Sequence, residues 1–172
     1  MNKENDFFDE GYEVPQTNGN YMKLKPGENR FRILSKPIIG WLDWKDNKPL
    51  RFRMKEKPNA PIDPAKKIKH FWAVIVWNYN ENKIAILELT QTSIQSAIQS
   101  LIKDDDWGSP FGYDIKIVKM GELLDTEYTT KPVPHKPASA EIVEQYMDSD
   151  INLEALFDGG DPFASNGSQD KF

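Results

Sequence analysis

The sequence predicts a mainly β domain of five strands, with one helix between the third and fourth strands and a flexible acidic C-terminal region. Short segments rich in Val, Ile and aromatic residues alternate with polar residues at the period of two that is typical of strands. Residues 92–103 carry an apolar stripe at helical spacing. Residues 141–172 hold one Lys against eight Asp and Glu. We therefore expect an acidic arm at 1–20, a folded domain at 21–137 and an acidic tail at 138–172.

The composition limits the class of protein. With 172 residues, 38% of them hydrophobic, the chain can bury one core. It has no run of about 18 apolar residues that could span a membrane, and its first residues lack the basic and apolar regions of a signal peptide. The absence of cysteine excludes disulfides and thiolate-bound metals. The simplest expectation is a cytoplasmic protein without cofactors, although the absence of cysteine fits an oxidising compartment equally well.

The charges are segregated along the chain. Residues 1–20 hold one Lys against five acids, residues 21–72 hold fourteen Lys and Arg against five, and residues 73–140 hold six against nine. The net charge of −5 thus hides a segment of +9. A basic segment followed by an acidic terminus indicates a polyanion-binding region and a tail that competes for it.

The first strand is expected at residues 29–34, where apolar Phe31 and Ile33 alternate with basic Arg30 and Arg32. It continues through residues 38–44 beyond Pro37. Residues 45–69 combine four prolines with the densest run of Lys and Arg. We expect a long functional loop there, with a short edge strand at 51–55.

Residues 69–89 read as a β-hairpin around which the domain is built. With Glu81 and Asn82 as a two-residue turn, Trp77 lies opposite Ile86. The expected core face holds Trp72, Val74, Val76, Leu87 and Leu89, and the expected ligand face holds Phe71, Ala73, Ile75, Trp77, Tyr79, Ile84, Ile86 and Glu88. The alternative is that both faces are buried.

The helix at 92–103 carries a capping-box pattern at Thr92 and Gln95. Two further strands are expected at 112–120 and 126–130, after which three prolines end the sheet. This order is that of an OB-fold, a five-stranded barrel that binds through its sheet face and its first-to-second and fourth-to-fifth loops. Those loops are residues 45–69 and 121–125.

Proteins that hold single strands combine a positive channel with aromatic faces on which bases stack. The candidate DNA-binding residues are Arg30, Arg32, Trp41, Trp44, Lys45, Lys48, Arg51, Arg53, Lys55, Lys57, Lys66, Lys67, Lys69, Phe71, Trp77, Tyr79 and Lys116. Taken singly, an aromatic residue in this set can instead belong to the core, and a lysine can belong to a solvated surface.

The C-terminal region offers two short helices, at 139–147 and 150–157, followed by a disordered tail. We expect residues 138–172 to compete with DNA for the basic segment. The alternative is that Ile142, Val143, Leu153, Leu156 and Phe157 pack on the barrel as structural helices.

Several runs together resemble phage-encoded single-stranded-DNA-binding proteins: residues 24–34, 69–79, 89–95, 106–110 and 112–115. The resemblance covers residues 21–132 and implies an OB-fold that coats single-stranded DNA without sequence preference during replication, recombination or repair, in the cytoplasm of a bacterial host. It also implies partner recruitment through Asp161, Pro162, Phe163 and the terminal Phe172. Unlike the bacterial tails of this kind, Pro-Phe lies nine residues inside the terminus and Lys171 precedes the last residue. The cysteine-bound zinc of some phage relatives cannot exist here.

Catalysis has little support, because His70 and His135 are the only histidines and lie in unrelated contexts. The acidic run at 104–106 fits a solvated helix end better than a cation site. The runner-up reading is an OB-type RNA-binding or recombination-mediator protein, followed by a purely protein-binding replication adaptor.

Overall fold

The computed structural model describes residues 20–164, and the predicted arm at 1–19 and the tail end at 165–172 lie outside the described residues. The strands β1 to β7 are Gly27–Ile33, Ile38–Lys45, Lys48–Arg53, Lys69–Asn78, Lys83–Leu89, Asp114–Met120 and Glu127–Pro132. Helices α1 and α2 are Thr92–Lys103 and Ala140–Asp148. Short 3-10 helices lie between these elements and after α2: η3 Met54–Glu56, η4 Pro110–Gly112, η5 Leu123–Asp125 and η6 Leu153–Asp158. None of the helices in the described part is long and apolar enough to cross a membrane.

Within residues 20–164 the strands form one antiparallel sheet in the order β3-β2-β4-β1-β6-β7. The remaining strand, β5, lies outside this order and pairs with β4. The mainly β prediction is confirmed, although the sheet has seven strands rather than five. The expected first strand is interrupted at residues 34–37, where the Ile75 backbone N–H donates to Ser35 Oγ (2.9 Å). Pro37, which has no N–H to donate, precedes β2. The interruption divides the expected first strand into β1 and β2, and β3 is the second strand beyond the predicted five.

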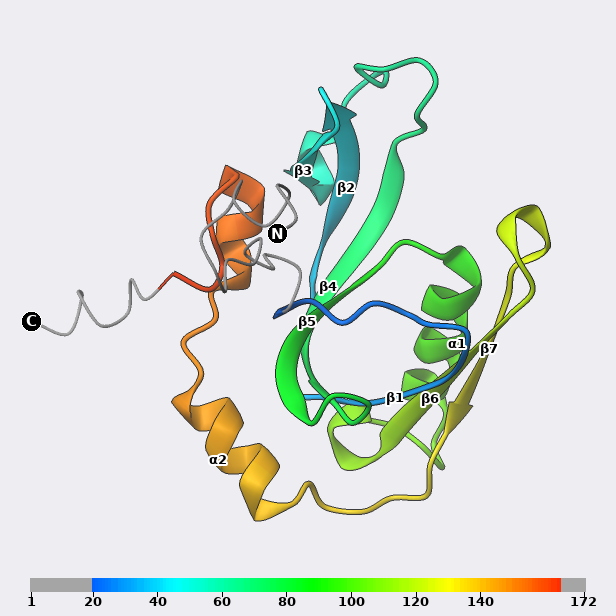
Figure 1. Cartoon of the computed structure of the whole chain (residues 1–172), viewed down its shortest axis with the longest axis vertical. Coiled ribbons are helices and arrows are strands. Elements are labelled where there is room, and N and C mark those ends of the chain that lie inside the picture. The colour runs from blue at the N-terminus through cyan, green and yellow to red at the C-terminus, as the bar shows by residue number, and fades with distance from the viewer. Residues whose placement is uncertain (1–19, 165–172) are drawn as a thin grey trace, which may run out of the picture.

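The sheet does not close into the predicted barrel. Closure would require pairing of the outer strands β5 and β7, and the described residues contain no such pair. Instead the segment at 20–26 crosses the gap between them (Figure 1), and the Met22 N–H donates to the Ile86 carbonyl (2.8 Å). Met22 and Leu24 then pack into the core that the missing pair would have covered.

For the β4–β5 hairpin, the sequence predicted the correct faces and the wrong register. Trp77 pairs with Ile84, two residues from the expected Ile86, because residues 79–82 form a four-residue loop with Asn82 at a φ of 53°. A shift by two keeps every side chain on its predicted face. The β2–β3 hairpin was missed: Asp46 and Asn47 both adopt positive φ and turn the chain within two residues. The irregular basic loop is therefore 54–68.

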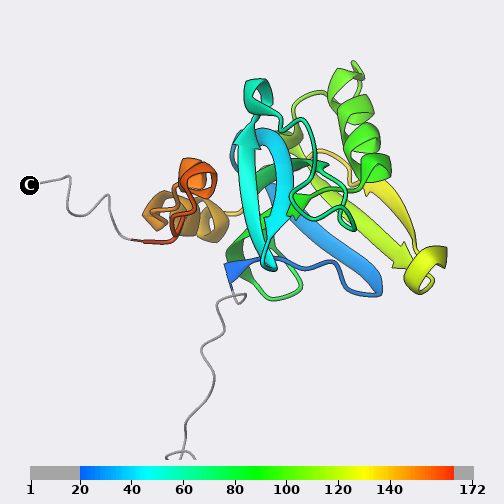
Figure 2. The ribbon, with the colours of Figure 1, turned by 90° about the horizontal axis from the view of Figure 1, so that it is seen from above.

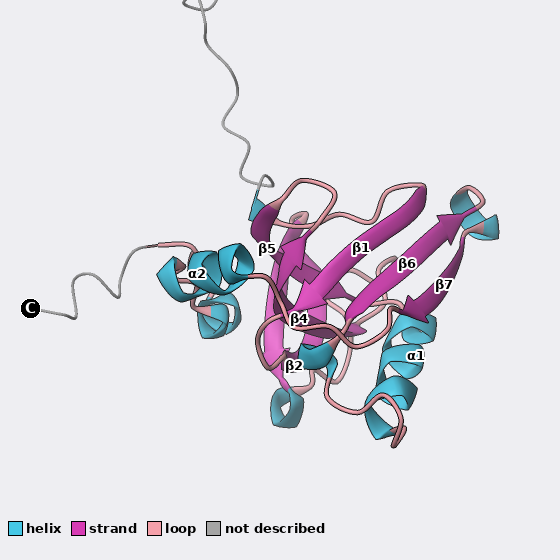
Figure 3. Cartoon of the chain, turned by 90° about the horizontal axis from the view of Figure 1, so that it is seen from below, coloured by secondary structure: helices cyan, strands magenta, loops and turns pink. Residues whose placement is uncertain are grey.

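Both faces of the central hairpin are buried in the described structure, so the predicted ligand face is wrong. One face joins a cluster of Met22, Phe31, Ile33, Val74, Val76, Ala85, Leu87, Leu89, Ile94, Ile98, Tyr113, Ile115 and Ile117, which α1 covers. The other joins a cluster of Ile38, Leu42, Phe71, Ala73, Ile75, Ile86, Leu153 and Leu156. Figure 3 shows α1 and α2 on opposite sides of the sheet.

The second cluster exists because the chain returns after β7. Ser139 Oγ caps α2 by accepting from the Ile142 N–H, and η6 buries Leu153 and Leu156 against the sheet. Phe157 packs on the same cluster, whereas Val143 is exposed. The described residues 138–164 thus follow the alternative reading, structural packing, instead of a flexible tail.

Helix α1 has its predicted bounds but not its predicted cap. Its N-cap is Gln91, without a side-chain capping bond. The Gln95 side chain donates instead to the carbonyls of Leu89 (2.9 Å) and His70 (3.1 Å). It therefore ties the helix to β4 and β5 and does not close a capping box.

Candidate nucleic-acid interface

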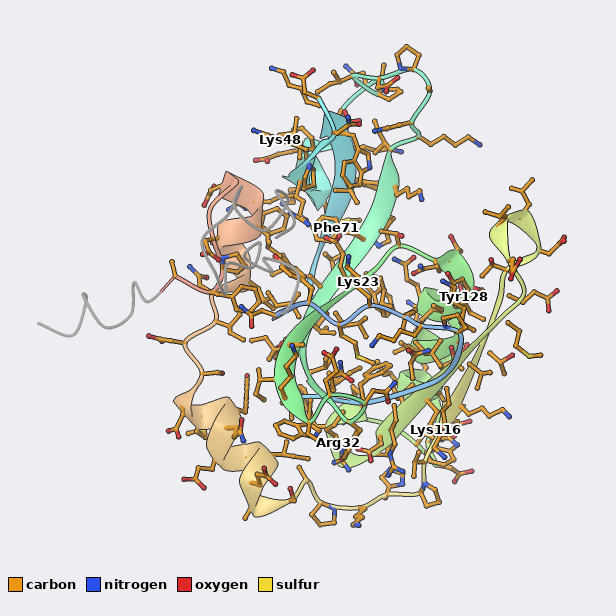
Figure 4. The ribbon with its side chains drawn as sticks, viewed as in Figure 1. Lys23, Arg32, Lys48, Phe71, Lys116 and Tyr128 are labelled. Atoms are coloured by element: carbon orange, nitrogen blue, oxygen red, sulfur yellow. The ribbon has the colours of Figure 1, made fainter. Side chains whose placement is uncertain are left out.

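A groove of about 690 Å³ crosses the molecule between the β2–β3 hairpin and the β6–β7 hairpin. Its lining residues are Tyr21, Met22, Lys23, Leu24, Trp44, Lys48, Pro49, Arg51, Leu87, Glu88, Gln91, Lys119, Tyr128, Leu156, Gly159 and Gly160. In Figure 4, Lys48, Lys23 and Tyr128 form a band across this face, and Arg32 and Lys116 lie at its lower edge.

The groove is positive and carries aromatic side chains. Lys23, Lys48, Arg51 and Lys119 face one acid, Glu88, so the lining sums to +3. Arg51 Nε donates to Glu88 Oε2 (2.7 Å), which fixes the guanidinium at the groove wall. Tyr21, Trp44 and Tyr128 are partly exposed there. Such a surface can attract phosphates and offer ring faces to bases.

Tyr21 is held in its neutral form at the groove. Burial raises the pKa of its hydroxyl, and the carboxylates of Glu88 and Asp161 act in the same direction, against the opposing effect of Arg51. A neutral phenol adds no negative charge to a surface that would bind a polyanion. The ring also meets Phe163 edge-on at 5.5 Å.

Trp44 joins the groove to a second hollow of about 520 Å³, lined by Trp44, Ala65, Lys66, Lys67 and Lys69. The ammonium of Lys66 lies 5.5 Å from the centre of the Trp44 ring and donates to Asn47 Oδ1 (2.8 Å). The groove and this hollow together form one basic track, which we call the groove track. Of the predicted residues, the groove track includes Trp44, Lys48, Arg51, Lys66, Lys67 and Lys69. Lys45 is exposed and lies opposite Lys48 in the β2–β3 ladder, beside the track.

Arg30, Arg32 and Tyr79 converge on Asp114 away from the track. Arg32 Nε donates to Asp114 Oδ1 (2.6 Å), Arg30 Nη2 donates to Oδ2 (2.7 Å), and the Tyr79 hydroxyl donates to Oδ1 (3.0 Å). Burial alone would raise the Asp114 pKa, but the hydrogen bonds from Arg32 and Arg30 outweigh it and hold the pKa below its ordinary value. This network ties β1, β6 and the end of β4 together.

Three predicted contacts are corrected by burial. Arg32 is 1% exposed, because the segment after β7 closes over it and the Lys136 carbonyl accepts from its Nη2 (2.6 Å). Phe71 is fully buried beside Phe157, with ring centres 6.0 Å apart. Trp77 is 3% exposed, so it offers no ring face to a base.

The remaining predicted residues lie elsewhere on the surface. Lys57 sits over the Trp41 ring at 4.3 Å, and Trp41 Nε1 donates to the Met54 carbonyl. Arg53 lies over the Phe157 ring (4.7 Å) and near Glu154 (3.6 Å), and Lys55 follows it in η3. Lys116 pairs with Glu28 at 3.5 Å.

The predicted partner-binding motif is packed on the domain where it is described. The Pro162 carbonyl accepts from the Asn152 N–H (2.8 Å), and Asp161 Oδ1 accepts from the Phe163 N–H (2.9 Å). Pro162 is buried, and Phe163 packs against the second cluster. Phe172 lies outside the described residues.

Sequence reasoning missed four groove residues: Tyr21, Lys23, Lys119 and Tyr128. Alternation of Tyr21, Lys23 and Lys25 before the first strand was a usable signal, because it places an aromatic and a cation on one side of an extended segment. Lys119 and Tyr128 face each other across the β6–β7 ladder, and only the pairing reveals that.

Comparison with known proteins supports the resemblance seen in the sequence. The chain is similar to the probable ssDNA-binding protein of Escherichia phage T5, with 26% identity over 174 aligned residues, which cover 80% of this chain and 67% of that protein. The chain is thus a distant homologue of that phage protein. No family model matches it, and no solved structure matches it significantly.

Proposed function

We propose that this protein binds and protects single-stranded DNA without sequence preference, through an open OB-type sheet and the groove track. The groove track carries the proposal: lysines and an arginine line two hollows that share Trp44, together with Tyr21 and Tyr128. Cations neutralise phosphates along the backbone, and aromatic faces accept any base. The distant homology to a probable ssDNA-binding protein points the same way. A non-catalytic role in phage DNA replication, recombination or repair, in the host cytoplasm, follows from this proposal.

The site sits on an unexpected part of the domain. The outer face of the central hairpin, which was expected to hold the strand, is covered by η6 and α2. The track instead runs along the unclosed side of the sheet, where the segment at 20–26 and the β2–β3 hairpin meet. Leu156, Gly159 and Gly160 of the C-terminal segment form one wall.

The test is a comparison of affinities for oligo-dT, a mixed-sequence strand, the matching RNA and a hairpin duplex. We expect tight binding to both DNA strands, weaker binding to duplex and a strong decrease with salt. A Lys48→Met/Lys119→Met variant should weaken binding and lower the salt slope by about 1.4, because each phosphate contact contributes about 0.7 on single strands. Equal affinity for duplex and oligo-dT contradicts the proposal, and a preference for RNA assigns the track to the runner-up class.

A further inference from the structure

The sheet has a second surface that faces solvent, on the side of β1, β6 and β7 that points away from the core. Figure 3 shows these three strands side by side with neither α1 nor α2 over them, and Figure 2, from the opposite side, shows the β2–β3 hairpin in front. Strand pairing brings three cations of this surface into one line: Arg30 lies opposite Lys116, and Lys116 lies opposite Lys131. We call these three residues the basic row. None of them lines the groove track.

The basic row keeps a positive charge in spite of two nearby acids. Asp114 pairs with Arg30 at 2.7 Å and also with buried Arg32 at 2.6 Å, so these three groups together leave one positive charge. Glu28 lies 3.5 Å from Lys116 and balances its charge.

Lys131 and Lys136 add two further positive charges. Both are exposed, and neither forms an ion pair within residues 20–164. Lys136 belongs to the same surface, because its carbonyl accepts from Arg32 Nη2 (2.6 Å). Glu127 lies four residues from Lys131 along β7, which is about 13 Å and exceeds the screening length of about 10 Å at 0.1 M salt. The surface around the basic row therefore carries a net charge of +3.

The arrangement of the basic row is unfavourable unless an anion binds to it. Side chains that lie directly opposite each other on paired strands are about 5 Å apart, and like charges in such pairs destabilise a sheet. Here two such pairs adjoin, and Lys131 stands exposed on the edge strand β7. A bound polyanion removes this repulsion, which makes the basic row a site for one.

The chemistry of the surface favours duplex DNA over a single strand. The guanidinium of Arg30 lies over the Tyr79 ring at 4.9 Å, Trp77 is buried, and the next cross-strand pair is Val118 and Thr129, so the surface offers no free ring face to a base. A duplex needs none, because its bases are already stacked. It also carries one charge per about 1.7 Å and releases more counterions per phosphate contact than a single strand.

The basic row lies close to one end of the groove. Lys119 and Tyr128 line that end, and Lys116 and Lys131 lie three residues away on the outer face of the same two strands. Three residues of a strand span about 10 Å. A DNA strand that leaves the groove across the edge strand β7 therefore reaches the basic row within a few nucleotides.

We propose that the basic row is a second nucleic-acid site, which binds the backbone of a DNA duplex while the groove track holds the adjoining single strand. Only this joint binding rests on the proposed function, since the basic row and its charge do not depend on the groove. Phosphate contacts without stacking make the basic row weaker than the groove track, so the protein still prefers single strands. The two sites act together because one DNA molecule tethers its duplex part near the basic row and raises the effective concentration there.

The experiment uses four probes at limiting protein: the shortest oligo-dT bound at full affinity, the same oligo-dT joined to a closed hairpin duplex, oligo-dT extended by the same number of phosphates, and the bare hairpin. For the wild type, the joined probe should bind more tightly than each of the others. Its gain over oligo-dT should fall by up to about fortyfold between 50 and 200 mM salt, because three duplex phosphates add about 2.7 to the salt slope.

Lys116→Met/Lys131→Met should leave the affinity for oligo-dT unchanged. Its salt slope on the joined probe should be lower by about 1.8, so that its smaller gain falls only about 3.5-fold over the same salt range. Its Tm should change little, because the loss of the Glu28 contact is offset by relief of the repulsion between opposed cations. Lys55→Met/Lys103→Met is the matched control, since both lysines are exposed and lie outside the groove track, and it should keep the whole gain.

The outcomes separate this inference from the proposed function. A joined probe that binds no more tightly than oligo-dT overturns the inference and leaves the proposed function standing. An equal gain on the extended oligo-dT overturns it as well, because a single strand then occupies the basic row. Weaker binding of Lys116→Met/Lys131→Met to the short oligo-dT also overturns it, since the row then belongs to the single-strand site. If the wild type does not bind oligo-dT, the proposed function fails and the bare hairpin decides: binding that this variant loses supports the duplex site, and no binding overturns it.

Discussion

Arg32→Met separates the structural role of this arginine from the DNA-binding role that its sequence position suggests. The guanidinium donates to Asp114 Oδ1, to the Phe111 carbonyl (3.0 Å) and to the Lys136 carbonyl (2.6 Å). Methionine keeps the apolar stem out to about the position of Nε and removes every donor. Asp114 retains Arg30 and Tyr79, so most of the cost falls on the two carbonyls that lose their donor.

The magnitude follows from the burial of those groups. A polar group left without a partner costs about 1–3 kcal/mol, and both carbonyls are only partly buried, which favours the lower half of that range. With the lost ion pair included, we expect the free energy of unfolding to fall by about 3 kcal/mol. In a domain of this size that lowers Tm by roughly 6–12 °C.

The assay pairs thermal unfolding with an oligo-dT titration. Lys48→Met is the matched control, because it removes one cation that lines the groove and lies on an exposed strand end. It should keep its Tm and lose affinity, with a salt slope lower by about 0.7. Arg32→Met should show the reverse, a lower Tm with near-normal affinity at a temperature where it is folded. An Arg32→Met protein with wild-type Tm and the binding loss of Lys48→Met would refute this assignment.

Three further predictions address pH, stacking and the C-terminal segment. The pKa of Asp114 lies below its ordinary 3.8 in the folded protein. The ionised carboxylate therefore stabilises the fold above pH 3.8, and this stabilisation is lost as the pH falls through the lower pKa of the folded state. Below that pH, urea titrations of the wild type and of Asp114→Asn should give the same free energy of unfolding. Tyr128→Ala and Trp44→Ala should each weaken oligo-dT binding by about 1–3 kcal/mol, measured by fluorescence titration at a temperature where the variant is folded, and an unchanged affinity would exclude stacking. Leu156→Ala should lower the free energy of unfolding by about 2–5 kcal/mol in a urea titration. Removal of residues 165–172, which hold one Asp and one Lys, should leave both stability and low-salt affinity unchanged, and a gain in affinity would show that this end competes with DNA.

Local pattern was sufficient for most elements of the fold. The apolar stripe of residues 92–103 gives α1 with its observed bounds, since helical periodicity depends on neighbours within two turns. Alternation likewise places every side chain of β4 and β5 on its correct face, even with the register shifted by two. The Asp46–Asn47 turn was not predicted, because neither residue is glycine, although both adopt positive φ.

The candidate site depended on contacts that no local pattern contains. Whether Phe71 faces solvent was decided by residues 138–164, which return to cover a face that alternation alone leaves open. The fate of Arg32 was decided by Asp114, 82 positions away, which turns a basic strand face into a buried ion pair.

The sequence by itself determined the strand-and-helix order, the segregated charge and the phage-type resemblance, because each is written in residues close along the chain or in composition. Only the tertiary structure decided where a strand of DNA could lie. Tyr21 and Tyr128 line one groove because the sheet stays open between β5 and β7, and the segment at 20–26 fills that gap. Burial and proximity are properties of the folded chain, and side chains distant in sequence acquire them only when the sheet brings them together.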